Sequence, residues 1–257
     1  MKFIGHLDIM RYFQKCMRRA DIDIRYSEGF SPHQIMSFAA PLGVGITSEG
    51  EYLDIEVHST RSSQESVLAL NEVMVEGMKV LEYKKLPDTA KTSMALVAAA
   101  DYRIYKKPTA NTAEYISARI EDISARIEEF LQQDEILIVK QTKKSEITMD
   151  LKPLIYEMKW EDGFFLKVCT GSKVNVKPEL VLEAFFKFCG SEFEPLEWQI
   201  HRLELYADAQ EIPVKGEKER EAYEAYLNSL KEDFKAQGKE FPQFVALGEL
   251  GEEISGI

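Results

Sequence analysis

Segments with helical and strand-like apolar patterns follow one another along this chain in an order that occurs twice. Each round approximates β-α-β-β-α-β, which is the ferredoxin-like plan. The sequence therefore predicts an α+β fold of two tandem ferredoxin-like halves, at residues 1–92 and 93–212, followed by a charged C-terminal helix and tail at 213–257. The first half is short of its opening strand, because only a few residues precede its first helix.

The individual elements follow from the same periodicity. In the first half the pattern predicts a helix that ends near Ala20, strands at 22–26, 34–38, 51–57 and 78–83, and a helix at 63–74. In the second half it predicts strands at 99–106, 136–139, 154–160, 164–169 and 198–206, with helices at 112–133 and after Pro178. The last segment contains a charged helix at 215–238 and, after it, a loose tail.

Cysteine usage and hydropathy predict a cytoplasmic protein. Cys16, Cys169 and Cys189 are odd in number and lie far apart in the chain, which is typical of reduced thiols in a cytosol. No apolar run approaches the roughly 18 residues that span a bilayer, and the first residues lack the pattern of a secretory signal. We therefore expect no interaction with a membrane.

The distribution of charge is more informative than its total. The net charge of −12 argues against a protein that coats nucleic acid along its whole surface. Residues 1–38, however, hold six basic and four acidic side chains, and residues 140–177 hold eight lysines and five acidic side chains. These two basic regions on an acidic chain form one binding face only if folding brings them together.

Several short motifs make the chain resemble a known family over residues 1 to 207. The motifs are Gly5-His6-Leu7-Asp8, Arg18-Arg19-Ala20, Tyr26-Ser27-Glu28-Gly29-Phe30-Ser31-Pro32, Pro41-Leu42-Gly43-Val44-Gly45, Ser48-Glu49-Gly50, Met149-Asp150-Leu151-Lys152-Pro153 and His201-Arg202. With them the chain resembles the bacterial radical-SAM-linked proteins, a domain family of unknown function. The resemblance implies a radical SAM protein as partner, encoded beside this chain or fused to it. Members usually carry Ser where this chain has Gly5, and a further strand upstream of Lys2.

Cys16, Cys169 and Cys189 exclude a radical SAM enzyme. A radical SAM enzyme needs closely spaced cysteines to hold an iron–sulfur cluster, and these three residues lack that spacing. The four histidines are not paired with cysteine at the spacing of a zinc site. We therefore expect no metal and no cofactor in this chain.

A polar set near the first helix forms the first candidate site. His6, Asp8 and His33, beside Arg11, could act as acid and base or hold a phosphate at the helix N-terminus. The alternative is structural, with Asp8 capping the helix, Arg11 paired with an acid and His6 packed at the turn.

A basic helix face and an aromatic loop form the second candidate site. Phe30 in the loop could stack a nucleobase, or it could anchor the loop in the core. Basic side chains could follow a phosphate backbone, although a solvated helix face has the same pattern. The candidate RNA- or phosphate-binding residues are Arg11, Lys15, Arg18, Arg19, Ser27, Phe30, Lys143, Lys144 and Lys173.

Three functions are compatible with these observations. The leading hypothesis is a non-catalytic accessory protein that binds RNA or substrate for a radical SAM partner enzyme. The first alternative is a metal-independent RNA-processing enzyme with His6 or His33 as acid and base. The second is a protein-interaction scaffold, in which the acidic surface and the helix at 215–238 dock a partner.

Overall fold

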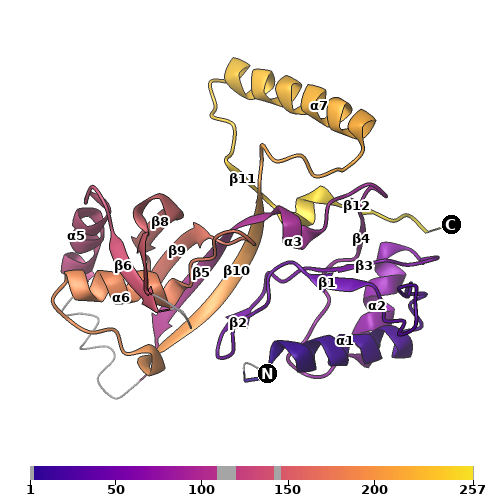
Figure 1. Cartoon of the computed structure of the whole chain (residues 1–257), viewed down its shortest axis with the longest axis horizontal. Coiled ribbons are helices and arrows are strands. Elements are labelled where there is room, and N and C mark those ends of the chain that lie inside the picture. Colours follow the sequence, from indigo (N-terminus) through magenta and orange to yellow (C-terminus); the bar gives the residue numbers. More distant parts are fainter. Residues whose placement is uncertain (1–2, 109–119, 142–145, 257) are drawn as a thin grey trace. The chain divides into compact units, whose positions relative to one another are not determined.

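The structure is a computed structural model that describes residues 3–108, 120–141 and 146–256 (Figure 1). Its architecture is α+β, with one mixed six-stranded sheet, three two-stranded sheets and a charged helix late in the chain. The chain divides into two compact units. Unit 1 comprises Met1–Val44, Glu51–Ala98 and Leu205–Ile257, and unit 2 comprises Gly45–Gly50 and Ala99–Glu204.

The first helix of unit 1, α1 (His6–Arg19), buries one face and exposes the other. Cys16 and Met17 are its buried residues, because apolar side chains recur at helical spacing along one side. Gly5 is the N-cap and no side chain caps the helix, so the expected capping by Asp8 is wrong. Asp8 instead lies in the first turn, where a carboxylate suits the helix dipole.

One core cluster of unit 1 consists of Met17, Ala20, Ile24 and Leu70, against which partly buried apolar side chains pack. Other buried apolar residues of this unit include Phe38, Leu205 and Leu247. The surrounding elements are α2 (Ser63–Val73) and the two-stranded sheet of β1 (Met36–Phe38) and β3 (Leu53–Ile55). A short helix, α3 (Ser93–Leu96), begins where Asp54 accepts two hydrogen bonds from Ser93, both of 2.6 Å.

Two strands predicted in unit 1 are not formed. Residues 22–26 make only single bridges, from Ile24 to Val57 and from Tyr26 to Gln34. Residues 78–83 do not form a strand. The Asn71 side chain instead accepts a hydrogen bond from the N–H of Val80 and donates one to its carbonyl oxygen, each at 2.8 Å. The strand in this region is the two-residue β4 (Lys84–Lys85).

The large sheet has the order β11-β10-β5-β9-β8. These strands are β11 (Phe244–Ala246), β10 (Trp198–Asp208), β5 (Val97–Lys106), β9 (Phe164–Cys169) and β8 (Ile155–Trp160). A sixth strand, β2 (Thr47–Ser48), pairs in parallel with β10. Strand β9 alternates buried and half-buried residues, as expected for a sheet with one face in the core.

Aromatic side chains fill the core of unit 2. Phe164 from β9 meets Phe185 and Phe186 from α6 (Pro178–Phe188) at ring-centroid distances of 5.6 and 6.1 Å, and Trp198 from β10 at 5.5 Å. Helix α5 (Ile120–Leu131) contributes Phe130, whose ring lies 5.5 Å from that of Phe185. Strands β6 (Leu137–Gln141) and β7 (Glu146–Asp150) form a separate antiparallel pair.

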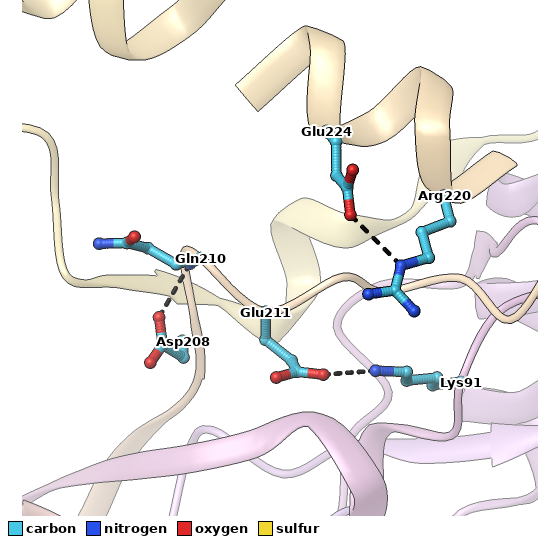
Figure 2. Close-up of polar contacts among 6 residues, drawn as sticks. All are labelled: Lys91, Asp208, Gln210, Glu211, Arg220 and Glu224. Carbon is cyan, nitrogen blue, oxygen red and sulfur yellow. Dashed lines mark hydrogen bonds and ion pairs between the residues drawn. The ribbon is translucent and has the colours of Figure 1, made fainter. Parts of the chain in front are cut away.

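The last part of the chain belongs to unit 1 and is not a loose tail. After α7 (Glu217–Ala236), β11 pairs with β10 and β12 (Glu252–Glu253) pairs with β4. The start of α7 is tied to residues 89–91 by an Ala90–Val214 bridge and by an ion pair between Lys91 and Glu211 (Figure 2). Residues 205–257 therefore belong to the same compact unit as residues 1–44 and 51–98. The sequence had predicted a separate C-terminal segment at 213–257.

No helix in the described ranges is both long enough and apolar enough to cross a membrane.

Candidate nucleic-acid interface

A row of basic side chains covers the exposed face of α1. Arg11, Lys15 and Arg18 are spaced four and three residues apart, so they lie along one stripe, and Arg19 is next to it. All four are exposed. Arg11 is 3.3 Å from Asp8, whereas no ion pair joins Lys15, Arg18 or Arg19 to a carboxylate in the described part of the chain. The row therefore keeps most of its positive charge available to an external anion.

The loop at 26–34 presents an aromatic ring to solvent. Phe30 at its tip is fully exposed, so the interpretation that it anchors the loop in the core is wrong. The neighbouring Gly29 has a φ of +112°, a conformation that side chains rarely adopt. Tyr26, at the base of the loop, is 43% exposed. A phenyl ring held in water gains apolar contacts only when a ligand covers it.

The loop is fastened to α1 beside the basic row. The Gln34 side chain donates to the main-chain carbonyl of Gln14 at 3.2 Å and to the Tyr26 hydroxyl at 3.3 Å. Gln14 follows Arg11 by three residues and precedes Arg18 by four, so it borders the same stripe. The base of the aromatic loop is thus bonded to the helix that carries the basic row.

The two histidines near this surface have different neighbours. His6 packs edge-on against Phe38, with ring centroids 5.7 Å apart, as the structural alternative predicts. The Nδ1 of His33 lies 2.8 Å from the Ser27 hydroxyl, and the main-chain N–H of His33 donates to the same oxygen at 3.1 Å. The tautomer of the imidazole decides which of the two groups donates in the contact between Nδ1 and the hydroxyl. Ser27 therefore orients His33 in an exposed loop.

The candidates of the second basic region lie in a different part of the chain. Lys143 and Lys144 lie outside the described residues. Lys173 is exposed in the turn at 171–175, after β9 in unit 2, whereas the row on α1 belongs to unit 1.

A polar chain around His201 was not predicted from the sequence. Its Nδ1 lies 2.8 Å from the Thr47 hydroxyl, and its Nε2 lies 3.6 Å from a carboxylate oxygen of Glu49. The parallel pairing of β2 with β10 places His201 opposite Thr47. A Cβ at Gly50 would lie 2.3 Å from the carbonyl oxygen of Leu203, so only glycine allows β2 to approach this closely. The sequence contains the motifs Ser48-Glu49-Gly50 and His201-Arg202, about 150 residues apart, but it gives no indication that the two segments lie side by side.

In residues 3–108, 120–141 and 146–256 no group of three or more histidine, cysteine, aspartate or glutamate side chains is arranged to hold a metal ion. The three cysteines are free, with Cys16 buried and Cys169 and Cys189 half-buried.

Comparison with protein families gives one match. Residues 1–178 match the family described as an uncharacterized protein conserved in bacteria, DUF2344. The chain belongs to the DUF2344 family. The match spans α1, the 26–34 loop and β2, so both polar surfaces of this DUF2344 protein include residues inside the family region. Comparison with curated proteins and with solved structures gives no match.

Proposed function

We propose that this protein is a non-catalytic accessory that binds RNA for a radical SAM partner enzyme. The observation that carries the proposal is the row of exposed, largely unneutralised basic side chains on α1, together with the exposed Phe30 ring in the loop whose base is bonded to α1. Single-stranded nucleic acid is bound by this combination, in which cations follow the phosphates and aromatic rings stack on bases. The radical SAM partner comes from the family resemblance of the sequence motifs.

The charge of the chain makes the proposed contact local. With a net charge of −12, most of the surface repels a polyanion, so binding depends on a few cations. Each phosphate contact on a single strand contributes about −0.7 to the slope of log K against log salt. Contacts from Lys15, Arg18 and Arg19 therefore predict a slope of about −2.

The proposal also includes a ferredoxin-like plan for each of the two units. We infer that unit 2 follows the ferredoxin-like plan, which the strand order β10-β5-β9-β8 and the helices after β5 and β9 support. For unit 1, the order of α1, β1, β3, α2 and β4 supports a reduced version of the same plan. Sheets of this plan provide platforms for RNA in other proteins, which is an analogy of fold and not of site.

The test is fluorescence anisotropy with a labelled 20-nucleotide single-stranded RNA, measured from low to physiological salt. The variant Lys15→Glu/Arg18→Glu should weaken binding at least tenfold and reduce the salt slope, because it reverses two charges of the row. The matched control is Lys218→Glu/Lys235→Glu on α7, which changes the net charge equally at two exposed sites. Equal losses in both variants, or no RNA binding by the native protein at low salt, would contradict the proposal.

A metal-independent RNA-processing enzyme is the second candidate, and one observation favours it. The Ser27 hydroxyl orients His33 in the loop that borders the basic row. A neutral imidazole that donates from Nδ1 to the Ser27 hydroxyl has a free lone pair on Nε2, which could act as a general base, and the protonated ring could act as a general acid. This candidate predicts RNA cleavage in the presence of a chelator, abolished by His33→Ala while RNA binding persists. Intact RNA after prolonged incubation would exclude it.

The protein-interaction scaffold remains a third candidate because of α7. Leu227 is the one buried residue of this helix, and its surface carries many charges, including the Arg220–Glu224 pair at 3.3 Å (Figure 2). A complex with a protein that survives nuclease treatment, and that is lost on charge reversal in α7 but not in α1, would favour this candidate over RNA binding.

A further inference from the structure

The segment at 251–256 lies in a groove of unit 1 in the manner of a bound peptide. On one side β12 pairs antiparallel with β4, with Glu252 opposite Lys85 and Glu253 opposite Lys84. On the other side Ser63 donates its main-chain N–H to the carbonyl of Ile254 at 3.0 Å, and its hydroxyl accepts from the N–H of Ile254 at 2.8 Å. The backbone of the segment is therefore held from both sides, which is the mode of strand addition used in peptide recognition.

Chemistry and shape select the occupant of this groove. Glu252 stands opposite Lys85, a favourable cross-strand arrangement of charge. Lys84, opposite Glu253, instead has its Nζ 2.8 Å from Glu82 and 3.0 Å from the carbonyl oxygen of Gly248. At Gly251 an added Cβ would lie 2.8 Å from the Cβ of Lys84, so the strand enters the groove at a residue without a side chain. The preferred occupant is thus an extended segment that begins with glycine followed by an acidic residue.

The segment does not fill the groove. A cavity of about 270 Å³ lies beside Glu253, with Val67, Leu68, Leu81 and Tyr83 as apolar walls and Ser63, Gln64 and Glu82 as polar ones. Leu68 and Leu81 remain 58% and 61% exposed, although they border the segment. An aliphatic side chain at position 253 would cover this apolar surface better than a carboxylate does.

We propose that this groove is a peptide-binding site that the 251–256 segment occupies within the chain. The partner is a protein with an extended glycine-acidic-aliphatic segment, whose aliphatic side chain enters the cavity next to Leu68 and Leu81. That segment displaces residues 251–256, because it makes the same backbone bonds and fills the cavity that Glu253 leaves open. This site is separate from the basic row on α1 and does not depend on RNA binding.

The first test measures hydrogen exchange of the Ile254 amide in the full chain. Glu253→Leu should slow exchange about tenfold, equivalent to about 1.4 kcal/mol, because the leucine enters the cavity. Glu252→Leu is the matched control, since it makes the same change of charge and hydropathy at a residue that does not line the cavity. Equal exchange rates in the two variants would overturn the proposal.

The second test measures displacement in trans. The probe is a fluorescein-labelled peptide of residues 250–256 with leucine in place of Glu253. It should bind the native protein and speed the exchange of the Ile254 amide. The Gly251→Val variant should bind the peptide more tightly, because the valine side chain weakens the binding of residues 251–256 of the chain itself. The Leu81→Glu variant should bind the peptide more weakly. No displacement at saturating peptide would overturn the proposal. So would protection of Ile254 that rises with protein concentration, since the occupant would then be a second copy of this chain.

Discussion

The cores of the two units differ in the side chains that fill them. In unit 2, Phe164 of β9 contacts four aromatic rings, which come from β8, β10 and α6. In unit 1, the cluster around α1 and α2 buries aliphatic and sulfur-containing side chains, and aromatic side chains such as Phe13 pack against it only partly buried. Buried area sets the hydrophobic contribution to stability. Truncation of Phe164 should therefore cost more stability than truncation of a residue in the unit 1 cluster.

The largest expected effect is in the aromatic core. Phe164→Ala should lower the free energy of unfolding by about 3–5 kcal/mol, because it removes a ring that is 1% exposed and leaves a cavity. Urea denaturation followed by tryptophan fluorescence measures it, since Trp160 and Trp198 both contact this ring. A loss below about 1 kcal/mol would mean that the neighbouring rings collapse into the space.

In the cluster around α1 and α2 the corresponding loss should be lower. Leu70→Ala should destabilise unit 1 by about 2–3 kcal/mol, since fewer large side chains surround Leu70. Hydrogen exchange resolved by segment measures the effect separately in α1 and in β9. If protection from exchange falls equally in α1 and in β9, the two units unfold together. The two units would then differ in side-chain packing but not in stability.

A substitution in the β2 segment tests how unit 2 holds this short strand. Gly50→Ala should cost about 1–3 kcal/mol, because the new Cβ meets the carbonyl of Leu203. The bond between Thr47 and His201 should be lost with it, which the NMR signals of the imidazole report. An unchanged imidazole environment would show that the backbone adapts elsewhere.

The N-terminus of α2 gives a smaller and pH-dependent effect. Ser62 and Glu65 form a capping box, and the Ser62 hydroxyl and N–H lower the pKa of the Glu65 carboxyl. A lowered pKa stabilises the fold above the ordinary value of 4.5, and this contribution is lost as the pH falls through the folded-state pKa. Ser62→Ala should therefore cost about 1 kcal/mol near neutral pH, and the difference from the native protein should shrink in acid. Unfolding curves across the pH range measure it, with a pH-independent difference as the contrary result.

The smallest expected effect on stability belongs to the candidate RNA surface. Phe30→Ala should change the unfolding free energy by less than about 0.5 kcal/mol, because the ring is already in water. RNA binding should nevertheless fall by about 1–3 kcal/mol if the ring stacks a base. Paired unfolding and anisotropy measurements separate the two, and a stability loss without a binding loss would assign Phe30 a structural role.

Periodicity in the sequence was enough to predict the long elements. Helices α1, α2 and α6 and strands β5, β9 and β10 lie where the apolar patterns place them, since each has a local repeat of buried residues. Helix α7 also lies where it was predicted, although Leu227 is its one buried residue. The basic row was also predictable, because helical spacing alone puts Arg11, Lys15 and Arg18 on one stripe. These features depend on residues within a few positions of one another.

Tertiary structure decided what depends on distant residues. Residues 78–83 have a strand-like sequence, yet the Asn71 side chain takes the backbone bonds of Val80. Thr47 meets His201 because β2 pairs with β10, and residues 252–253 form a strand because β4 offers a free edge. The sequence alone also left open whether Phe30 is buried or exposed. Local periodicity determines which face of a helix or strand is apolar, whereas the partner that satisfies each backbone and side-chain group is chosen only when the chain folds.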